Sequence, residues 1–249
     1  MFEPVKIALG QFVRKWFDDL APTTKPLVRY VSLPYADAVQ MVPGRMIDAA
    51  TDALNKYLRA DNKDGKPSAP YVLPVTLIGL ASDYTPTGRD YTRQISEGVF
   101  FRAPDDEKGR VFRVRTIAGD IRAQIVFIAQ EPPTARSMAA QFLLFLDRPD
   151  SRRFLADYVY AGKVHRFPVQ VESPDSPAMQ VSADPAKNLC ILAVDITLKC
   201  TVPIFDAPKA GEANDGLGTP GSYRDPAGYP VVTEVQANDR TITVEEDSE

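Results

Sequence analysis

Histidine and cysteine, on which most nucleophilic and metal-dependent enzymes rely, are scarce in this chain of 249 residues. It holds one histidine, His165, and two cysteines, Cys190 and Cys200. A Ser-His-Asp triad would have to use His165, which lies beside an arginine and a phenylalanine in a predicted strand. One histidine and two distant cysteines do not form a standard zinc ligand set. The composition therefore disfavours an enzyme, and we predict no cofactor and no bound metal.

Motifs for nucleotide and acyl-transfer chemistry do not supply an alternative. The sequence contains no G-x-x-x-x-G-K-[ST] loop and no G-x-S-x-G nucleophile elbow. An acid-rich stretch at residues 104–109, PDDEKG, falls in a predicted hairpin turn, where its carboxylates are expected to be solvated. Acid pairs assemble in space rather than in sequence, so catalysis by carboxylates alone stays open.

Long hydrophobic runs are also missing. No apolar stretch approaches the roughly 20 residues that a membrane-spanning helix needs. The N-terminal segment does not have the layout of a secretory signal, because charged side chains interrupt it at Lys6, Arg14, Lys15, Asp18 and Asp19. We expect no membrane association and a protein that is cytoplasmic in the cell that makes it.

The two cysteines belong to one alternating stretch, CILAVDITLKC, at residues 190–200. Ten residues of strand span roughly 33 Å, which is far beyond disulfide reach, so the two thiols do not pair with each other. We expect both to be small buried apolar residues, on the strand face that also carries Val194, Ile196 and Leu198. A bridge between two chains is the alternative.

The formal net charge of −4 is unevenly distributed. Residues 206–249 hold ten acids and three bases and so carry −7, which leaves +3 on residues 1–205. A mildly basic body with an acidic tail does not have the charge of a nucleic-acid-binding protein. It suits a tail that crosses onto a basic neighbour.

Hydrophobic periodicity predicts the elements of the first part of the chain. Residues 3–22 form an amphipathic helix that ends at Pro22, with an apolar stripe of Leu9, Phe12, Val13, Trp16 and Leu20. The next predicted elements are a short strand at 26–35, a helix over 37–60 that is broken at Pro43 and Gly44, and a strand at 71–84 that contains Pro74. Polar loops are predicted at 61–70 and 85–94.

An antiparallel meander is predicted next. Its first two strands lie at 98–102 and 110–116, and RTIAGDIR, residues 115–122, makes the turn into a third strand at 123–130. In the middle strand the apolar Phe112 and Val114 alternate with the basic Arg113 and Arg115. This alternation indicates a half-buried antiparallel sheet with one basic face.

The hydrophobic period changes within residues 121–146. Before Pro132 and Pro133 the apolar residues alternate, and after them they recur at spacings of three and four. We predict a strand ended by the prolines, an N-cap at Thr134 and an apolar helix that stops before Pro149. The buried positions are Ile121, Ala123, Ile125 and Phe127 in the strand, and Met138, Phe142, Phe145 and Leu146 in the helix.

The last third of the chain completes the predicted fold. Two short strands surround a glycine turn in residues 154–174, and the longest strand of the chain covers 187–205. After Phe205 the sequence is rich in Gly, Pro, Asp and Ala, which predicts an extended or disordered arm, in which VVTEV and RTITVEE could each add a strand to another chain. The fold class is α+β, with a mixed, largely antiparallel sheet and helices packed on one face. We expect a body of residues 1–205 and an extended acidic C-terminal arm of residues 206–249.

Three segments carry a resemblance to a known family. They are VLPVTLIGLASDYTPTGRDY at residues 72–91, IRAQIVFIAQEPPTARSMAAQFLLFL at 121–146 and NLCILAVDITLKCTVPIFDAP at 188–208. In this order, and after an amphipathic N-terminal helix, the chain resembles the tail completion proteins of contractile phages, the tail sheath stabilisers or tail terminators of the T-even type. One departure is that the last segment ends in a single aromatic residue, Phe205, where the family has a heavier aromatic cluster.

The resemblance implies a structural virion protein that forms a homohexameric ring at the head-proximal end of a contractile tail. Such a ring terminates the tail tube and sheath and joins the tail to the neck or connector proteins of the head. Genomic DNA would pass through its lumen without specific binding. A closed ring uses heterologous contacts, which need arms and apolar surfaces rather than catalytic groups. The protein would be assembled in the host cytoplasm and reside in the virion.

Candidate contact residues under this interpretation lie in loops, on the basic sheet face and in the tail: Arg89, Asp90, Tyr91, Arg113, Arg115, Tyr223, Arg224 and Tyr229. Two alternatives stay open. One is another head–tail connector or baseplate component of the virion. The other, less favoured, is a small-molecule binding protein or an enzyme, which a pocket holding His165 with an acid and a hydroxyl would support.

Overall fold

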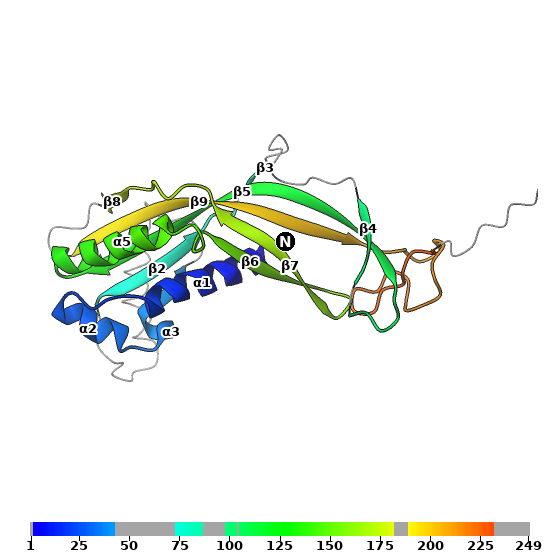
Figure 1. Ribbon diagram of the computed structural model, residues 1–249, viewed down its shortest axis with the longest axis horizontal. Coiled ribbons are helices and arrows are strands. Elements are labelled where there is room, and N and C mark those ends of the chain that lie inside the picture. The colour runs from blue at the N-terminus through cyan, green and yellow to red at the C-terminus, as the bar shows by residue number, and fades with distance from the viewer. Residues whose placement is uncertain (1, 43–72, 87–97, 104, 182–188, 232–249) are drawn as a thin grey trace, which may run out of the picture.

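A mixed, largely antiparallel sheet runs through the whole molecule. The computed structural model describes residues 2–42, 73–86, 98–103, 105–181 and 189–231. Nine strands form one sheet with the path β1-β2-β5-β9-β7-β6, to which β3 and β4 add by pairing with β5 and β8 by pairing with β9. The helices gather at one end of the elongated molecule and pack on one face of the sheet (Figure 1). The predicted α+β class is confirmed.

The elements follow one another in a simple order. The helices of the described residues are α1 (Glu3–Asp18), α2 (Lys25–Val31), α3 (Tyr35–Ala38) and α5 (Pro132–Asp147). The strands are β1 (Val39–Val42), β2 (Val75–Leu80), β3 (Thr85–Pro86), β4 (Val99–Arg102), β5 (Val111–Ala129), β6 (Arg153–Tyr160), β7 (Lys163–Val171), β8 (Ala178–Val181) and β9 (Cys190–Asp206). None of these helices is both long enough and apolar enough to cross a membrane.

Two long strands, β5 and β9, extend from the helical end of the molecule to the opposite end (Figure 1). All 17 residues of β9 pair with β5 in one unbroken antiparallel register, from Cys190 opposite Ala129 to Asp206 opposite Arg113. The turn predicted at residues 115–122 is therefore wrong, and the 19-residue β5 is longer than β9. Gly119 is paired on both sides, and a Cβ at this position would stand 3.1 Å from the ring of Tyr84. The glycine admits that ring rather than making a turn.

The main hydrophobic core lies between the helices and the sheet. Trp16 of α1 is buried, with its ring 5.3 Å from Phe127 of β5 and 5.7 Å from Phe142 of α5. The predicted apolar stripe of the first helix is buried, as are the predicted positions of β5 and α5. The alternate residues of β5, Val126 and Ile128, belong to a second cluster with residues of β2 and β9. The period change in residues 121–146 thus predicted this unit correctly.

Several local predictions fail near the helices. Residues 26–35, predicted as a strand, contain α2 and the start of α3. Pro26 stands in the first turn of α2, and Leu27 and Tyr30, three residues apart, are its buried side chains. The helix predicted from residue 37 gives way at once to β1. Beyond these points, residues 43–72, which include the rest of that predicted helix and a loop, lie outside the described residues.

The strand–helix junction also differs in detail from its prediction. Pro132 and Pro133 begin α5 rather than preceding it, and the N-cap position is Glu131. Thr134 is completely buried inside the first helical turn, where its hydroxyl lies 2.8 Å from the hydroxyl of Thr24. Proline suits the first helical positions because their N–H groups have no intrahelical acceptor. The predicted N-cap at Thr134 is therefore wrong, and the hydroxyl of Thr134 instead joins α5 to Thr24, just before α2.

The β6–β7 hairpin and the cysteines agree with their predictions. Ala161 and Gly162 make the turn with φ of 50° and 73°, the left-handed conformation that a tight two-residue hairpin needs. β7 pairs with β9 only through Val169–Val171, so most of the hairpin extends away from that pairing. Cys190 and Cys200 are buried, and no disulfide joins them.

Candidate functional site: the distal lobe

The end of the molecule farthest from the helices forms a small lobe of its own. We call it the distal lobe and define it as β4, residues 105–117 leading into and beginning β5, residues 201–206 ending β9, the hairpin residues 157–167, and residues 207–231 (Figure 1). It brings together three stretches that are far apart in the sequence, at residues 99–117, 157–167 and 201–231. Five of the eight predicted contact residues lie in it.

Aromatic rings fill the interior of the distal lobe. Phe112 and Tyr160 are buried, and the ring of Tyr160 stacks on that of Phe205 with centroids 4.6 Å apart and planes 7° apart. Phe101 and His165 complete the cluster, with the imidazole ring 5.0 Å from that of Phe205 and 5.6 Å from that of Phe101. Phe205, the single aromatic at the end of its strand, thus meets rings supplied by β4 and the hairpin.

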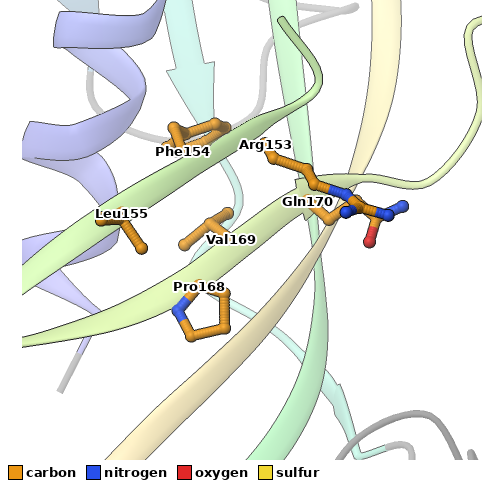
Figure 2. Close-up of a pocket in the computed structure, with 6 residues that line it drawn as sticks. All are labelled: Arg153, Phe154, Leu155, Pro168, Val169 and Gln170. Atoms are coloured by element: carbon orange, nitrogen blue, oxygen red, sulfur yellow. The ribbon is translucent and has the colours of Figure 1, made fainter. Parts of the chain in front are cut away.

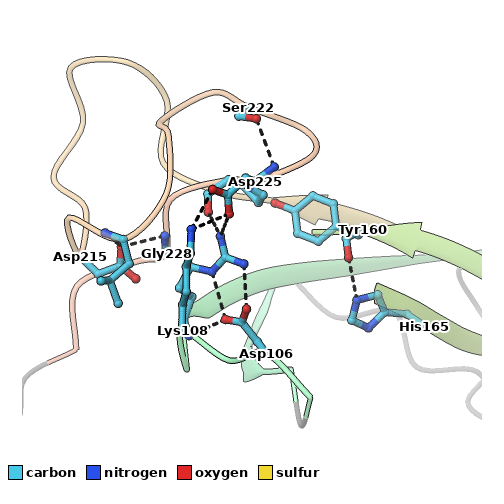
Figure 3. Close-up of polar contacts among 11 residues, drawn as sticks. Asp106, Lys108, Tyr160, His165, Asp215, Ser222, Asp225 and Gly228 are labelled. Carbon is cyan, nitrogen blue, oxygen red and sulfur yellow. Dashed lines mark hydrogen bonds and ion pairs between the residues drawn. The ribbon is translucent and has the colours of Figure 1, made fainter. Parts of the chain in front are cut away.

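A buried arginine ties residues 207–231 to the rest of the lobe (Figure 3). Arg110 is 4% exposed, and its guanidinium donates to both carboxylate oxygens of Asp106, at 2.8 and 3.0 Å. It also donates to Asp225 at 2.5 Å and to the carbonyl oxygen of Pro226 at 2.6 Å. Lys108 adds a second cation on Asp225 at 2.8 Å. Planar bidentate donation of this kind fixes orientation as well as distance.

The charges of this network hold one another in the ionised state. Hydrogen bonding from Arg110 lowers the pKa of Asp106, although partial burial opposes this shift. Hydrogen bonding to Asp106 in turn raises the pKa of Arg110. At Asp225 the pKa is lowered first by Lys108 and then by Arg110. Nearby, burial raises the pKa of Tyr160 to about 12, so that this phenol stays neutral.

Residues 207–231 fold into loops rather than extending from the molecule. Their backbone returns to the sheet where the Tyr229 N–H donates to the Val111 carbonyl at 2.8 Å. A Cβ at Gly218, where φ is 92°, would stand 2.6 Å from the Pro226 carbonyl oxygen, and one at Gly228 would overlap Asp215. These residues contain no helix or strand, and they contact their own chain. Residues 232–249 lie outside the described part.

These loops also contain a glycine pattern that the sequence analysis missed. Residues 216–221, GLGTPG, spell G-x-G-x-x-G, the pattern of a dinucleotide-binding turn. That turn requires a strand before it and a helix after it, so that the phosphates meet a helix N-terminus. Here the three glycines have φ of 73°, 92° and 77° in consecutive loops, and no helix follows within residues 207–231. The three glycines therefore allow the positive φ angles that these loops need.

The structure brings some of the predicted contact residues together. Tyr229 lies where Arg113 and Arg115 act on its phenol electrostatically, and its pKa is raised chiefly by burial and by Asp206. Tyr223 donates its hydroxyl to the Val159 carbonyl of the hairpin at 2.5 Å, with its ring 67% exposed. Arg224 is exposed beside it. The predicted residues Arg89, Asp90 and Tyr91 lie outside the described residues.

The single histidine lies against the hairpin turn and the aromatic cluster. His165 Nε2 lies 3.3 Å from the carbonyl oxygen of Tyr160, across the hairpin turn, and its ring is flanked by the rings of Phe101 and Phe205. Within the described part of the chain, these contacts of His165 include neither an acid nor a hydroxyl. Among the described residues, no group of three His, Cys, Asp or Glu side chains is placed to hold a metal ion.

A shallow apolar groove lies at the base of the hairpin, where β6 and β7 leave the helices (Figure 2). It has a volume of about 340 Å³ and is lined by Arg153, Phe154, Leu155, Pro168, Val169 and Gln170. Leu155 and Pro168 face each other across the two strands. The groove continues onto the outer face of the hairpin, and it offers apolar contact without a set of convergent polar groups.

Comparison with known proteins adds no family to these observations. No family model matches the chain, and no curated protein matches it.

Proposed function

We propose that the protein is a structural virion component that forms a ring, terminating the tail tube and sheath of a contractile phage and joining the tail to the head and neck. It acts without catalytic residues or a cofactor. Its partners are further copies of the chain, in a ring of six, the tail tube and sheath proteins, and the neck or connector proteins. Genomic DNA passes through the lumen without specific binding, and the protein resides in the virion.

The observation that carries the proposal is the exposure of large apolar side chains on the distal lobe. Val99 and Phe100 on β4 are 54% and 59% exposed, and Tyr223 of the adjoining loops is 67% exposed. Exposed apolar side chains gathered in one lobe are typical of a protein–protein contact site. The long strands β5 and β9 carry the lobe away from the helical body, as expected of a part that reaches a neighbour (Figure 1).

Two further features support a structural role. The element order and the three segments described above resemble those of tail terminator proteins. Polar side chains of the described residues also support the fold internally, as Arg110 does on Asp106 and Gln124 on Asp195. A ring protein needs subunits whose ends carry contact surfaces for their neighbours. In this proposal the exposed apolar side chains of the distal lobe are one such surface.

The test is the solution mass of the full chain by light scattering, together with negative-stain electron microscopy. We expect a mass near six chains and ring-shaped particles. Phe100→Asp, on the exposed face of β4, should abolish the ring, because it places a charge in a contact. Val28→Asp is the matched control, since Val28 is 55% exposed on α2, outside the distal lobe. A monomer at millimolar concentration that also fails to bind purified tails would refute the proposal.

Position in the particle separates this function from its nearest alternative. Gold-labelled antibody against the chain should bind phage tails at the head-proximal end. Labelling at the far end of the tail would instead identify a baseplate component, and labelling at the portal would identify a head–tail connector.

A further inference from the structure

The outer face of the β6–β7 hairpin carries an ordered pattern of apolar and charged rows. Three cross-strand pairs lie on it in sequence: Leu155 opposite Pro168, Asp157 opposite Arg166, and Val159 opposite Val164. The alternate residues of β6, among them Phe154 and Tyr158, are buried on the inner face. Beyond the Arg153–Gln170 pair at the base of the hairpin, the outer face is therefore apolar, charged and apolar in turn along the strands.

This face is open to solvent. Leu155, Val159 and Val164 are 51%, 54% and 55% exposed, which is high for aliphatic side chains in strands. The groove described above adjoins the Leu155 row, and the exposed ring of Tyr223 stands beside the opposite end of β6. In the middle row, Arg166 Nε lies 3.3 Å from Asp157 Oδ1, and both side chains are more than half exposed. Because an ion pair lies between two apolar rows, a partner with a matching pattern can align on this surface in only a few positions.

The pattern is complementary to itself. If a second copy is placed face to face, about a two-fold axis that runs parallel to the strands, β6 of one copy lies over β7 of the other. Leu155 then meets Pro168, Val159 meets Val164, and each Asp157 meets an Arg166 of the opposite copy. An axis across the strands would instead bring Asp157 onto Asp157, which is repulsive. Only the first arrangement satisfies both charge and apolar contact.

We infer that the outer face of this hairpin is a docking surface for a second copy of the chain, packed hairpin on hairpin about that two-fold axis. Three rows of a two-stranded ribbon cover less than the ~800 Å² per partner of a standard interface. The contact is accordingly weak between free chains and forms at high local concentration. An isologous contact is distinct from the head-to-tail contacts that close a ring, so the inference goes beyond the proposed function.

The experiment uses two charge-reversed full-length chains, Asp157→Arg and Arg166→Asp. Each variant alone places like charges face to face across the axis, and its self-association should be at least about tenfold weaker than that of the natural chain. Mixed in equal amounts, they restore both opposite-charge pairs, so self-association measured by sedimentation should return to that of the natural chain. The replaced ion pair is exposed, so both variants should fold, which circular dichroism checks.

A disulfide test fixes the axis independently. Val159→Cys on one chain and Val164→Cys on another should form an oxidised dimer only when the two variants are mixed. The natural Cys190 and Cys200 are buried and stay silent. The inference is overturned if charge-reversed chains associate no better mixed than alone, or if Val159→Cys crosslinks with itself. A hairpin dimer without ring particles would refute only the proposed function, and rings without the mixed dimer would refute only the hairpin contact.

Discussion

The helical body and the distal lobe of the same sheet are stabilised in different ways. In the body, α1 and α5 cover the sheet, and the largest buried side chains are apolar or aromatic, such as Trp16 and Phe142. In the distal lobe the buried apolar cluster is small, centred on Phe112 and Tyr160, and a buried Arg110 with its carboxylates supplies the cross-links. A small lobe cannot bury enough apolar area to order long loops, so fixed charges take over part of that role.

The largest expected effect comes from the body. Trp16→Ala should lower the free energy of unfolding by about 3–5 kcal/mol, because it leaves a cavity between Phe127 and Phe142 that the sheet cannot close. Urea denaturation followed by circular dichroism measures it. Ile7→Ala, at a position of the same helix that is 58% exposed, should change the value by less than about 0.5 kcal/mol. Equal losses would show that α1 is not the core helix of the body.

The next effect is confined to the distal lobe. Arg110→Met should cost about 3 kcal/mol locally, because it leaves the Asp106 carboxylate, 5% exposed, buried without its cation. Hydrogen exchange of the Tyr229 amide, which bonds Val111, should speed up while amides of α5 keep their protection. Lys108→Met removes only a half-exposed cation from Asp225 and should have a smaller effect. Uniform loss of protection would contradict a separately stabilised lobe.

Acid should act on the lobe before it acts on the body core. Since its folded-state pKa is lowered, Asp106 contributes stability above the ordinary carboxyl pKa of about 4, and this contribution is lost as the pH falls through the lowered value. The protection factor of the Tyr229 amide should therefore be constant near neutrality and fall below about pH 4. In Asp106→Asn this acid step should become smaller, and Asp225, whose pKa is also lowered, accounts for what remains. Loss of protection on raising the pH would have the wrong sign.

The smallest effect concerns the contact between the loops and the hairpin. Tyr223→Phe removes the hydroxyl that donates to the Val159 carbonyl, while the ring stays. The bond is exposed, so the change should cost about 0.5–1 kcal/mol or less in urea denaturation. A loss above 2 kcal/mol would mean that residues 207–231 depend on this contact more than on Arg110.

Much of the fold could be predicted from the sequence, because its signals are local. The stripe of α1, the glycine turn after β6 and the alternation of β9 depend only on hydrophobic period and turn chemistry. Predictions failed where tertiary pairing overruled a local signal. Gly119 and Asp120 are residue types typical of a turn, yet β3 and β9 pair with them on both sides, so β5 continues through them without a break. At residues 26–31 the β-branched content suggested a strand, while Leu27 and Tyr30 needed helical spacing to reach the core.

The distal lobe was less accessible to prediction, because its contacts join residues distant in the chain. Arg110 and Asp225 are separated by 115 residues, and nothing in the composition of the acidic tail pairs one of its carboxylates with a particular base. The tail was therefore predicted to leave the molecule. The one usable signal was the cluster of glycines between residues 211 and 228, which is dense enough to indicate tight loops rather than a simple linker.

The unbroken register of β5 and β9 has a mechanical consequence. A pull on the distal lobe along the strands stretches β5 and β9 side by side, so the load is shared by two backbones that the ladder of hydrogen bonds holds in register. Sliding by one residue would also turn every side chain to the wrong face of the sheet. The two strands thus behave as a stiff lever that transmits displacement from one end of the molecule to the other with little stretch.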